Sequence, residues 1–560
     1  MTVRQSERMK NHGQSNPALN RHDVALLVLQ IGAAALVLGK GITEGGLRYG
    51  DAPAHAMDGV LIHDWIASGP QAWLHPLAFA EKQYAHYPTL GIGRHYPPGF
   101  AVVEAGFFGL FGISAVTSRM CVVFFGIIAV VATYFFVRFL ADRAAAALAA
   151  VALLTLPSTV EWGRDTMLEV PMMAALACGA VAAGAYLRTP TCKRLAWMNA
   201  VFIAALFFKQ TAVFVFVATA LTLGVGALRK AVPSPHAAIQ ALMSAGVLVV
   251  VALSLDGHAT HLLRGDATYA DRWSWDVGTG YLQIVPRQVG LPILVAATLG
   301  IIVLLRNHFL QGVFCCAWFA SCWAMLTFSD FKYDRYLFPG LFPFAICASW
   351  GVVDAASWMT YAKVRPVAAC AAGIALCVNA IAVPVRTRVD LGPVVAAHRE
   401  RMEGRAVLVS GLREGDVVFA ARQQLPWRST ILLRASKLFY SCNGRPNLEF
   451  EARAGSRDAV EEMLMQLAPN LILVERHEKT GVPQEQWLRE ALRAGTNYRT
   501  IAEHACTLSP DSSNRQVIVD VFAPTHPTLR ASTFVDIPIA RANRTVRVEL
   551  PANSSTQAYE

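Results

Sequence analysis

Long apolar runs separated by short polar segments fill the first two thirds of the chain. They lie at residues 24–42, 117–137, 144–157, 168–187, 195–208, 211–228, 238–255, 289–305, 309–328, 336–354 and 366–385. Because about 20 apolar residues cross a hydrocarbon core roughly 30 Å thick, this pattern predicts about eleven membrane-spanning helices within residues 24–385. The run at 100–112 is too short to span comfortably, so we expect it to be re-entrant or to lie in the membrane interface.

The composition agrees with this pattern and excludes an ordinary soluble protein. Of the 560 residues, 54% are hydrophobic and only 16% are charged, and the mean hydropathy is +0.39. Such values are typical of a polytopic membrane protein. The net charge of +10 does not indicate nucleic-acid binding, because many Lys and Arg residues lie in short clusters between apolar runs, where they act as topology signals. The expected partner is therefore the membrane, and no nucleic acid is expected.

The basic clusters predict how the chain crosses the membrane. They are Arg138 with Arg143, Arg188 with Lys193 and Arg194, Arg229 with Lys230, Arg306, and Lys363 with Arg365. Because Lys and Arg concentrate in cytoplasmic loops, these clusters and the N-terminal segment 1–23 are predicted to be cytoplasmic. The loop 43–99 and everything after about residue 386 are then exported. This predicts a multi-pass protein of a bacterial-type cytoplasmic (inner) membrane, provided that residues 100–112 do not cross it.

The pattern changes after residue 385. Residues 386–525 are predicted to form a soluble α/β domain on the exported side, and residues 526–560 a poorly ordered tail. Short apolar runs at 406–410, 471–474 and 517–522 indicate buried parallel strands, with helices at 457–467 and 485–493 between them. No glycine-rich nucleotide-binding motif opens a helix there. Cys442 and Cys506 lie in this region, and they would form a disulfide in an oxidising compartment.

Within the exported first loop, residues 57–66 carry apolar side chains at helical spacing, with Asp58, His63 and Asp64 between them. This arrangement predicts a helix that lies on the membrane surface. Ionisable groups beside or within a bilayer are candidates for function by default, because each costs about 2.5–3.5 kcal/mol at a helix centre. The polar character of this loop therefore makes it the first place to look for a site.

Other candidate side chains are predicted on the same exported side. The full set is Asp51, His55 and Asp58 in the first loop, Tyr96 before the next apolar run, Arg164 and Asp165 in the third connection, Lys209 between two helices, and Asp334 and Arg335 before a Tyr-Leu-Phe-Pro run. Carboxylates are suited to activating a hydroxyl group, and cations to neutralising a phosphate. The planar guanidinium of an arginine also matches phosphate oxygens in a bidentate way. We take Asp51 and Asp165 as the candidate catalytic residues and the others as candidates for substrate binding.

Each candidate also has an ordinary structural interpretation. Asp51 is a solvated loop carboxylate or a helix N-cap, and Asp165 is a second N-cap. Lys209 marks a helix end, with its ammonium group extended toward the interface. Asp334 and Arg335 form a surface ion pair. These alternatives stay open from the residues alone.

Several of these features together resemble a known family. They are Asp51 in a D-x-x-x-H-A context, Tyr96-Pro97-Pro98-Gly99-Phe100 at the entry to the next apolar run, Arg164-Asp165, the lysine Lys209 between paired helices, and Asp334-Arg335-Tyr336-Leu337-Phe338-Pro339. In their order and their shared side, they resemble the GT-C glycosyltransferases. The most similar branch is glycosyltransferase family 39, the protein mannosyltransferase and aminoarabinose-transferase-like group. The resemblance covers roughly residues 20–385.

The resemblance implies a polyprenyl-phosphate-linked sugar as donor, with an acidic residue of the first exported loop in catalysis. The matching position here is Asp51. Many members have Asp-Glu at this point, whereas this chain has Asp51-Ala52, so Asp165 or Asp58 would have to supply a second acidic function. The resemblance also implies that Lys209 and Arg335 contact the donor phosphate.

The leading hypothesis is an inverting membrane glycosyltransferase that transfers the sugar to a hydroxyl group of a lipid, protein or glycan acceptor at the exported membrane face. The cofactor is left open, with a divalent cation held by carboxylates as one option. His55 and His95 lack the fixed spacing of metal ligands, so no protein metal site is predicted. A transporter or flippase for a lipid-linked or small polar substrate is the alternative, although the chain has no repeated halves with paired interrupted helices. A membrane scaffold is a third, non-enzymatic hypothesis.

Overall fold

A computed structural model describes most of the chain. The described residues are 20–48, 50–91, 96–254, 275–327, 334–357, 364–441, 451–476, 481–495, 497–510, 515–526, 533–539 and 544–551. Contacts divide the chain into two compact units, each built from segments that are distant in sequence. The helical unit comprises Met1–Lys40, Val123–Gly163 and Glu169–Pro384, and the mixed unit comprises Gly41–Val122, Arg164–Leu168 and Val385–Glu560. Each unit is described by itself.

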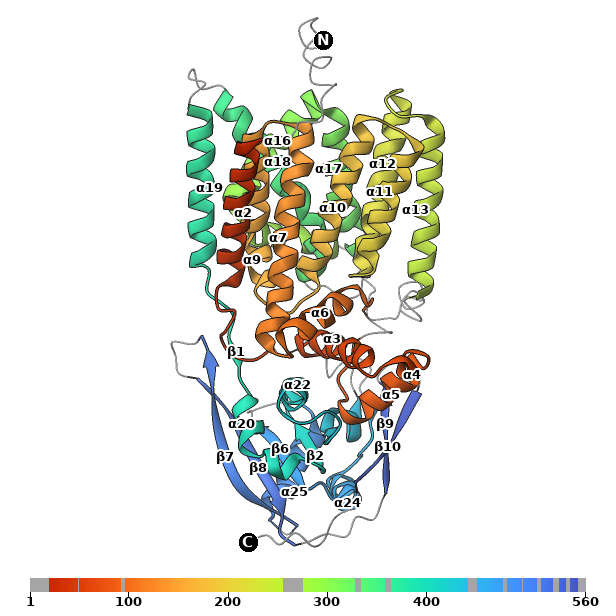
Figure 1. The fold of residues 1–560 in the computed structure, drawn as a ribbon, viewed down its shortest axis with the longest axis vertical. Helices are drawn as coiled ribbons and strands as arrows, with labels where there is room; N and C mark the ends of the chain where they lie inside the picture. The colour runs from red at the N-terminus through yellow and green to blue at the C-terminus, as the bar shows by residue number, and fades with distance from the viewer. Residues whose placement is uncertain are drawn as a thin grey trace, which may run out of the picture. The chain divides into compact units, whose positions relative to one another are not determined.

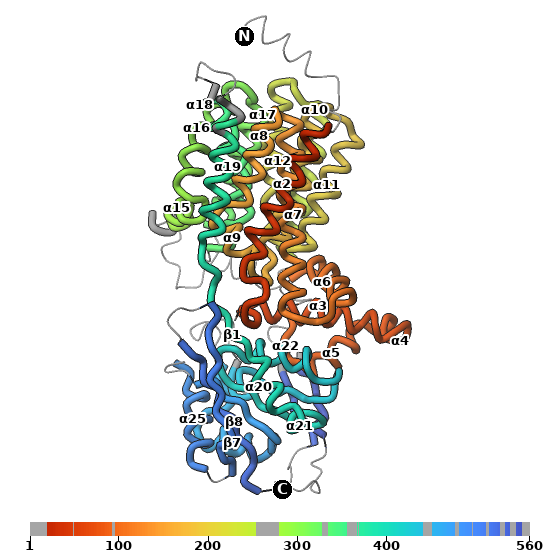
Figure 2. Tube along the Cα trace, turned by 60° about the vertical axis from the view of Figure 1, so that its left-hand side comes forward, coloured from red at the N-terminus to blue at the C-terminus, as the bar shows by residue number. Residues whose placement is uncertain are grey.

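The helical unit is a bundle of long apolar helices (Figure 1). Its elements are α2 (Arg21–Gly39), the end of α7 (Ala115–Leu140), α8 (Arg143–Thr155), α9 (Pro157–Gly163), α10 (Glu169–Arg188), α11 (Cys192–Leu206), η1 (Gln210–Val213), α12 (Phe214–Leu228), α13 (Ser234–Ser254), α15 (Trp275–Val289), α16 (Leu291–Asn307), α17 (Phe309–Thr327), η3 (Asp334–Leu341), α18 (Phe342–Ser357) and α19 (Val364–Ala382). Helix α19 packs against α8 and α2, and Figure 2 shows this group from a second direction. The predicted polytopic helical architecture is confirmed.

The predicted number of eleven spans is not confirmed. Every predicted run forms a helix, but within the described residues seven helices are long and apolar enough to cross a membrane, or up to nine if each of two bent pairs is one span. Helices α8 and α9 bend by 60° where Pro157 begins α9, and α15 and α16 bend by 110° around Gly290, whose φ is +86°. Helix α11 has 15 residues, so it is shorter than the hydrocarbon core requires. Bends and short helices, which an apolar run alone does not show, account for the difference.

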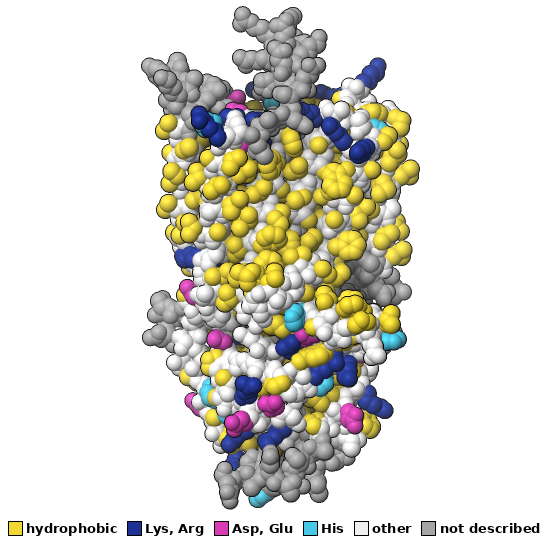
Figure 3. Space-filling view, viewed as in Figure 1, with side chains coloured by type: hydrophobic (Ala, Val, Ile, Leu, Met, Phe, Trp, Pro, Cys, Tyr) yellow, Lys and Arg dark blue, Asp and Glu magenta, His cyan; other side chains and the backbone are white. Residues whose placement is uncertain are grey.

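The face of the helical unit drawn in Figure 3 is largely apolar, and Lys and Arg side chains gather at one end of it. Exposed side chains on α2 include Val28, Leu29 and Leu36, at 62%, 70% and 68% exposure. Such a surface suits lipid rather than water. Two of the basic residues predicted to be cytoplasmic, Arg138 and Arg143, bind Asp23 near the start of α2, with Nε–Oδ1 distances of 3.3 and 3.0 Å. These two arginines therefore lie at the same end of the unit as the start of α2, as the predicted topology requires.

Close packing inside the bundle depends on small residues. A Cβ atom on Gly300 of α16 would lie 1.7 Å from the backbone oxygen of Cys347 of α18, and one on Gly351 of α18 would lie 2.1 Å from the backbone oxygen of Ala296. Only glycine permits this approach of the two helix backbones, an arrangement common between membrane helices.

The mixed unit combines the first loop with the C-terminal α/β region. Its helices are α3 (Ala52–Ala67), α4 (Pro70–Trp73), α5 (Pro76–His86), α6 (Gly99–Phe111), the start of α7, α20 (Gly392–Ala397), α21 (Arg399–Met402), α22 (Glu414–Gln424), α23 (Ala435–Leu438), α24 (Arg457–Leu467) and α25 (Pro483–Arg493). Its strands are β1 (Arg388–Val389), β2 (Ala406–Ser410), β3 (Ile431–Arg434), β4 (Tyr440–Ser441), β5 (Glu451–Ala452), β6 (Leu471–Arg476), β7 (Tyr498–Ser509), β8 (Gln516–Pro524), β9 (Phe534–Ile539) and β10 (Arg544–Glu549). Helix α6 has 13 residues, about 20 Å, and it packs against α3.

The main sheet has the strand order β1-β7-β8-β6-β2-β3. Strand β2 pairs in parallel with β3 and β6, as predicted for residues 406–410 and 471–474. The prediction for residues 517–522 was wrong in direction, because β8 runs antiparallel to both β6 and β7. The predicted helices at 457–467 and 485–493 are confirmed as α24 and α25. The direction of β8 has a simple physical reason. Only a short segment joins β7 to β8, and a connection of this length can join neighbouring strands only in the antiparallel direction.

Residues 526–560 were predicted to be a tail, but they contain the antiparallel pair β9 and β10. Val546 and Val548, two positions apart in β10, are both buried, as expected for one face of a strand. The polar composition of the segment hid this alternation in the sequence. The proposed disulfide stays a prediction, since Cys442 lies outside the described residues. Cys506 is buried in β7.

The first loop and the α/β region share one core within this unit. Tyr84 of α5 belongs to the same buried cluster as Leu408 of β2 and Leu433 of β3. Asp64 of α3 accepts two hydrogen bonds from Arg422 of α22, at 3.0 and 2.5 Å. The predicted helix at 57–66 is confirmed as part of α3, but its polar side chains do not form a solvated face, because Asp58 and Asp64 are both buried.

Candidate functional site

One face of α3 carries three of the predicted site residues. Asp51 occupies the N-cap position, and His55 and Asp58 follow at i+4 and i+7, so all three lie on the same side of the helix. His55 and Asp58 are buried, and Asp51 is half-buried. Pro53 in the first turn helps start the helix at this point, because its fixed φ suits the first helical turn.

Tyr96 covers this face and connects its members. Its hydroxyl donates a hydrogen bond to Asp51 Oδ2 at 3.0 Å, and its ring meets the His55 ring edge-on, with centroids 4.4 Å apart. Its backbone N–H donates to the carbonyl of Gly91, whose own N–H donates to Asp58 Oδ1 at 2.8 Å. A Cβ atom on Gly91 would lie 2.8 Å from the Tyr96 ring, so this position requires glycine. The structure thus brings four predicted residues together, namely Asp51, His55, Asp58 and Tyr96.

The Asp51 side chain is oriented by Tyr96. It makes no capping hydrogen bond to the helix backbone, so the ordinary N-cap interpretation does not describe it. The carboxylate instead accepts a hydrogen bond from the Tyr96 hydroxyl at the N-terminal end of α3. A carboxylate held in one orientation is suited to accepting a proton from a hydroxyl group.

A carboxyl group that the sequence analysis missed lies behind this face. Glu104 of α6 is fully buried, accepts a hydrogen bond from Ser118, and would contact any side chain at Gly59 of α3. Ser118 also bonds to Thr166 at 2.7 Å. Burial raises the pKa of Glu104 well above its usual value, and the charge of Asp58 raises it further. Burial thus favours the neutral form of the Glu104 carboxyl group. In the sequence, Glu104 is a lone carboxylate within the short apolar run 100–112. An ionisable residue in such a run is a candidate for function, so the sequence analysis should have included Glu104.

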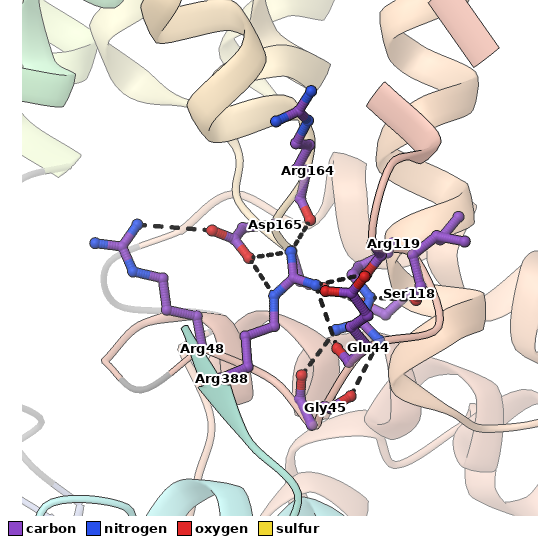
Figure 4. Close-up of polar contacts among 12 residues, drawn as sticks. Glu44, Gly45, Arg48, Ser118, Arg119, Arg164, Asp165 and Arg388 are labelled. Atoms are coloured by element: carbon purple, nitrogen blue, oxygen red, sulfur yellow. Dashed lines mark hydrogen bonds and ion pairs between the residues drawn. The ribbon is translucent and has the colours of Figure 1, made fainter. Parts of the chain in front are cut away.

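Asp165 is held in a buried ion pair, shown in Figure 4. The guanidinium of Arg388 donates to its carboxylate at 2.9 Å, and both side chains are almost fully buried. Arg48 lies 3.7 Å away from the other oxygen. The neighbouring Arg164 contributes its backbone carbonyl to Arg388 at 2.5 Å, and burial together with the charge of Arg388 lowers the pKa of the Arg164 side chain to about 10. Asp165 thus binds an arginine 223 residues away rather than capping the helix that follows.

Two buried arginines also fix the chain before the first loop. Arg388 donates to the carbonyls of Gly41 and Glu44 at 2.8 and 3.3 Å. Arg119 donates to the carbonyls of Ile42, Gly46 and Gly45 at 2.8, 2.7 and 3.2 Å (Figure 4). The segment leading to Asp51 is therefore anchored through its backbone. Arg388 and Arg119 were not among the predicted site residues.

The remaining candidates belong to the helical unit. Lys209 is buried and binds Glu169 of α10 at 2.5 Å, with its ammonium 5.5 Å from the centre of the Tyr336 ring. It is therefore not a lysine extended into solvent. The guanidinium of Arg335 lies 5.6 Å from the centre of the same ring.

Asp334 pairs with Arg287 at 3.0 Å, and both side chains are at least half exposed. Lys332 and His95 lie outside the described residues. Among the residues that are described, no group of three or more His, Cys, Asp or Glu side chains could hold a metal ion.

Comparisons with known proteins place this architecture. Residues 95–254 match the sequence-family model described as dolichyl-phosphate-mannose-protein mannosyltransferase. The fold is similar to that of ArnT from Cupriavidus metallidurans in the apo state, with a TM-score of 0.55 and 14% identity over 89% of this chain and 98% of that chain. The same protein bound to undecaprenyl phosphate gives a TM-score of 0.52 and 12% identity, over 88% of this chain and 97% of that chain. A search of curated protein sequences gives no match.

Residues 95–254 are thus similar to a mannosyltransferase family, and the chain shares the fold of ArnT. The resemblance inferred from the sequence is thereby confirmed.

Proposed function

We propose that the protein transfers a sugar from a polyprenyl-phosphate-linked donor to a hydroxyl group of an acceptor, with Asp51 as the general base. The observation that carries this proposal is the half-buried Asp51 carboxylate, which is oriented by a hydrogen bond from the Tyr96 hydroxyl. The match to a mannosyltransferase family and the fold shared with an undecaprenyl-phosphate-binding protein support the donor class. Transfer at the exported face of a cytoplasmic membrane is part of the proposal.

In this reaction Asp51 accepts the proton of the acceptor hydroxyl as the hydroxyl oxygen attacks the anomeric carbon of the sugar. The bond from that carbon to the phosphate oxygen breaks, and the polyprenyl phosphate departs with the bonding electrons. The configuration at the anomeric carbon inverts. General base catalysis of this kind contributes about 10²- to 10⁴-fold to the rate.

The neighbours of Asp51 have positioning roles in this scheme. Tyr96 keeps the carboxylate in one orientation, and His55 fixes the Tyr96 ring. Asp58 holds the turn at Gly91, and its charge adds to the raised pKa of Glu104, so we assign it to positioning as well. Asp165 was predicted to be catalytic, but its ion pair with Arg388 favours an anchoring role.

The cations are proposed as contacts of the donor phosphate. Lys209 and Arg335 flank the Tyr336 ring, and Arg164 is the third candidate. Lys209 already neutralises Glu169, so a phosphate there would have to share the ammonium group. The proposal leaves open whether a divalent cation also contacts the donor phosphate. It specifies neither the sugar nor the acceptor.

The test uses purified full-length protein with labelled polyprenyl-phosphate sugars and a panel of hydroxyl acceptors. Asp51→Asn should reduce transfer by about 10²-fold or more, because the isosteric amide cannot accept the proton. Tyr96→Phe should reduce it less, since only the orientation of the base is lost. Asp458→Asn, at an exposed position of α24, is the matched control and should leave transfer unchanged. Full transfer by the Asp51 variant would remove this residue as the base, and solute uptake without transfer by the wild type would favour a transporter.

A further inference from the structure

A cavity of about 740 Å³ lies in the mixed unit, apart from the α3 face. Its walls come from α5, from the segment before β3 and from β10, and Figure 1 shows α5 beside β9 and β10. Three cationic side chains, Lys82, Arg428 and Arg547, line it together with His86 and Ser429. Glu81 and Glu549 are the acidic residues of the lining.

Arg428 is held in this cavity by an unusual backbone conformation. Its φ is +59°, in the left-handed region that ordinary side chains avoid, and its backbone N–H donates to the Tyr87 hydroxyl at 3.2 Å. Its guanidinium lies over the Trp427 ring at 4.1 Å and over the Phe79 ring at 4.7 Å. Non-glycine residues persist in this conformation only where their surroundings impose it, and such residues cluster at ligand-binding sites.

The guanidinium has hydrogen-bonding capacity that the described residues do not use. Its Nε and Nη2 atoms are buried, and among the described residues they have no hydrogen-bond partner. The hydroxyl of the next residue, Ser429, is also buried and also has no hydrogen-bond partner among the described residues. A buried donor without a partner costs free energy, and these three atoms belong to two residues that line the cavity, so a ligand that accepts hydrogen bonds would satisfy them.

The charge of the cavity specifies the ligand further. Arg428 and Lys82 both lie close enough to His86 to lower its pKa, after the larger effect of burial. Arg547 is already paired with Asp536, so Arg428 and Lys82 are the other cations of the lining; they lie beside the carboxylates of Glu81 and Glu549, and the charge of Asp64 also acts on Arg428. The fork formed by Nε and Nη2 of an arginine matches two oxygens of a phosphate group.

We propose that the cavity beside Arg428 binds a phosphoryl group, carried either by a soluble phosphate ester or by a lipid headgroup. Nε and Nη2 of Arg428 donate to two phosphoryl oxygens, and Ser429 and Lys82 supply further donors. The rings of Trp427 and Phe79 keep the guanidinium in place. This site does not depend on the proposed sugar transfer, because binding can be measured without turnover.

The test is isothermal titration calorimetry of the full-length protein in a phosphate-free detergent. One arm uses a hexose phosphate, with the unphosphorylated hexose as its control, and the other uses a short-chain phosphatidic acid. Arg428→Gly removes the fork while providing the residue that best tolerates positive φ, so the variant should fold at least as well as the wild type. It should weaken binding by about 10- to 100-fold, the loss expected for hydrogen bonds to a charged group.

Two further variants complete the experiment. Arg428→Lys keeps the charge without the fork, and it should recover only part of the affinity. Arg457→Gln, which removes a surface arginine paired with Glu461, should bind like the wild type. Binding in one arm only would identify the source of the phosphoryl group. Absence of binding in both arms, or equal binding by Arg428→Gly, would overturn the proposal, whereas loss of transfer by Asp51→Asn has no bearing on it.

Discussion

The buried ion pair between Arg388 and Asp165 permits a quantitative test of how the mixed unit is held together. Arg388 binds the Asp165 carboxylate and the carbonyls of Arg164, Gly41 and Glu44. Replacing Arg388 with Met, which has a similar shape, leaves the Asp165 carboxylate buried without its hydrogen-bonded arginine, with Arg48 3.7 Å away and the charges of Arg119 and Arg164 nearby. Removing one partner of a buried pair costs about 3–5 kcal/mol.

This loss should be visible in thermal unfolding followed by fluorescence. For a unit of roughly 250 residues, each kcal/mol lowers the Tm by about 2–4 °C, so Arg388→Met should lower it by about 6–20 °C. The double variant Arg388→Met with Asp165→Leu removes both charges, and it should be more stable than Arg388→Met alone, because the carboxylate that lost its hydrogen-bonded arginine is no longer present. Arg399→Met, at an exposed position of α21, is the control.

Two results would refute this reasoning. A Tm change below about 2 °C for Arg388→Met would mean that the pair contributes little. A double variant as unstable as the sum of the single variants would mean that the two residues act independently. The double variant also separates the two roles of Asp165, since a folded protein that still transfers sugar would exclude Asp165 as a catalytic residue.

Three further predictions concern other parts of the chain. The pKa of Glu104 is raised in the folded state, so ionisation of this group opposes folding once the pH rises above its unfolded pKa of about 4.3. Glu104→Gln removes this effect and should raise the Tm relative to wild type at pH 8. The difference in Tm should vanish near pH 4. Arg422→Met leaves Asp64 of α3 buried without its arginine, and it should lower the Tm and impair transfer through displacement of α3, with a larger effect on stability than on binding of the donor. Gly300→Ala should reduce the yield of folded protein in size-exclusion chromatography, because the added methyl meets the α18 backbone, whereas Gly224→Ala, with open space around its Cα, should behave like wild type.

The sequence alone identified the helical bundle and the neighbourhood of Asp51. Apolar runs long enough for the membrane became helices because a backbone in lipid must satisfy its own hydrogen bonds. The spacing of Asp51, His55 and Asp58 put them on one helix face for a similarly local reason, since 3.6 residues make a turn. The contacts of Tyr96 with these side chains depend on tertiary packing. The family resemblance had already indicated Asp51 and Tyr96 as residues of interest.

Only the tertiary structure decided which charges are paired. Arg388 lies 223 residues from Asp165, and Arg422 lies 358 residues from Asp64, so no local pattern indicates either pair. The direction of β8 and the bends at Pro157 and Gly290 were likewise set by contacts or backbone angles that hydrophobicity does not encode. Hydrophobic periodicity reports how each segment is buried, whereas the partner of a buried charge depends on which distant segments meet, and that is a property of the fold as a whole.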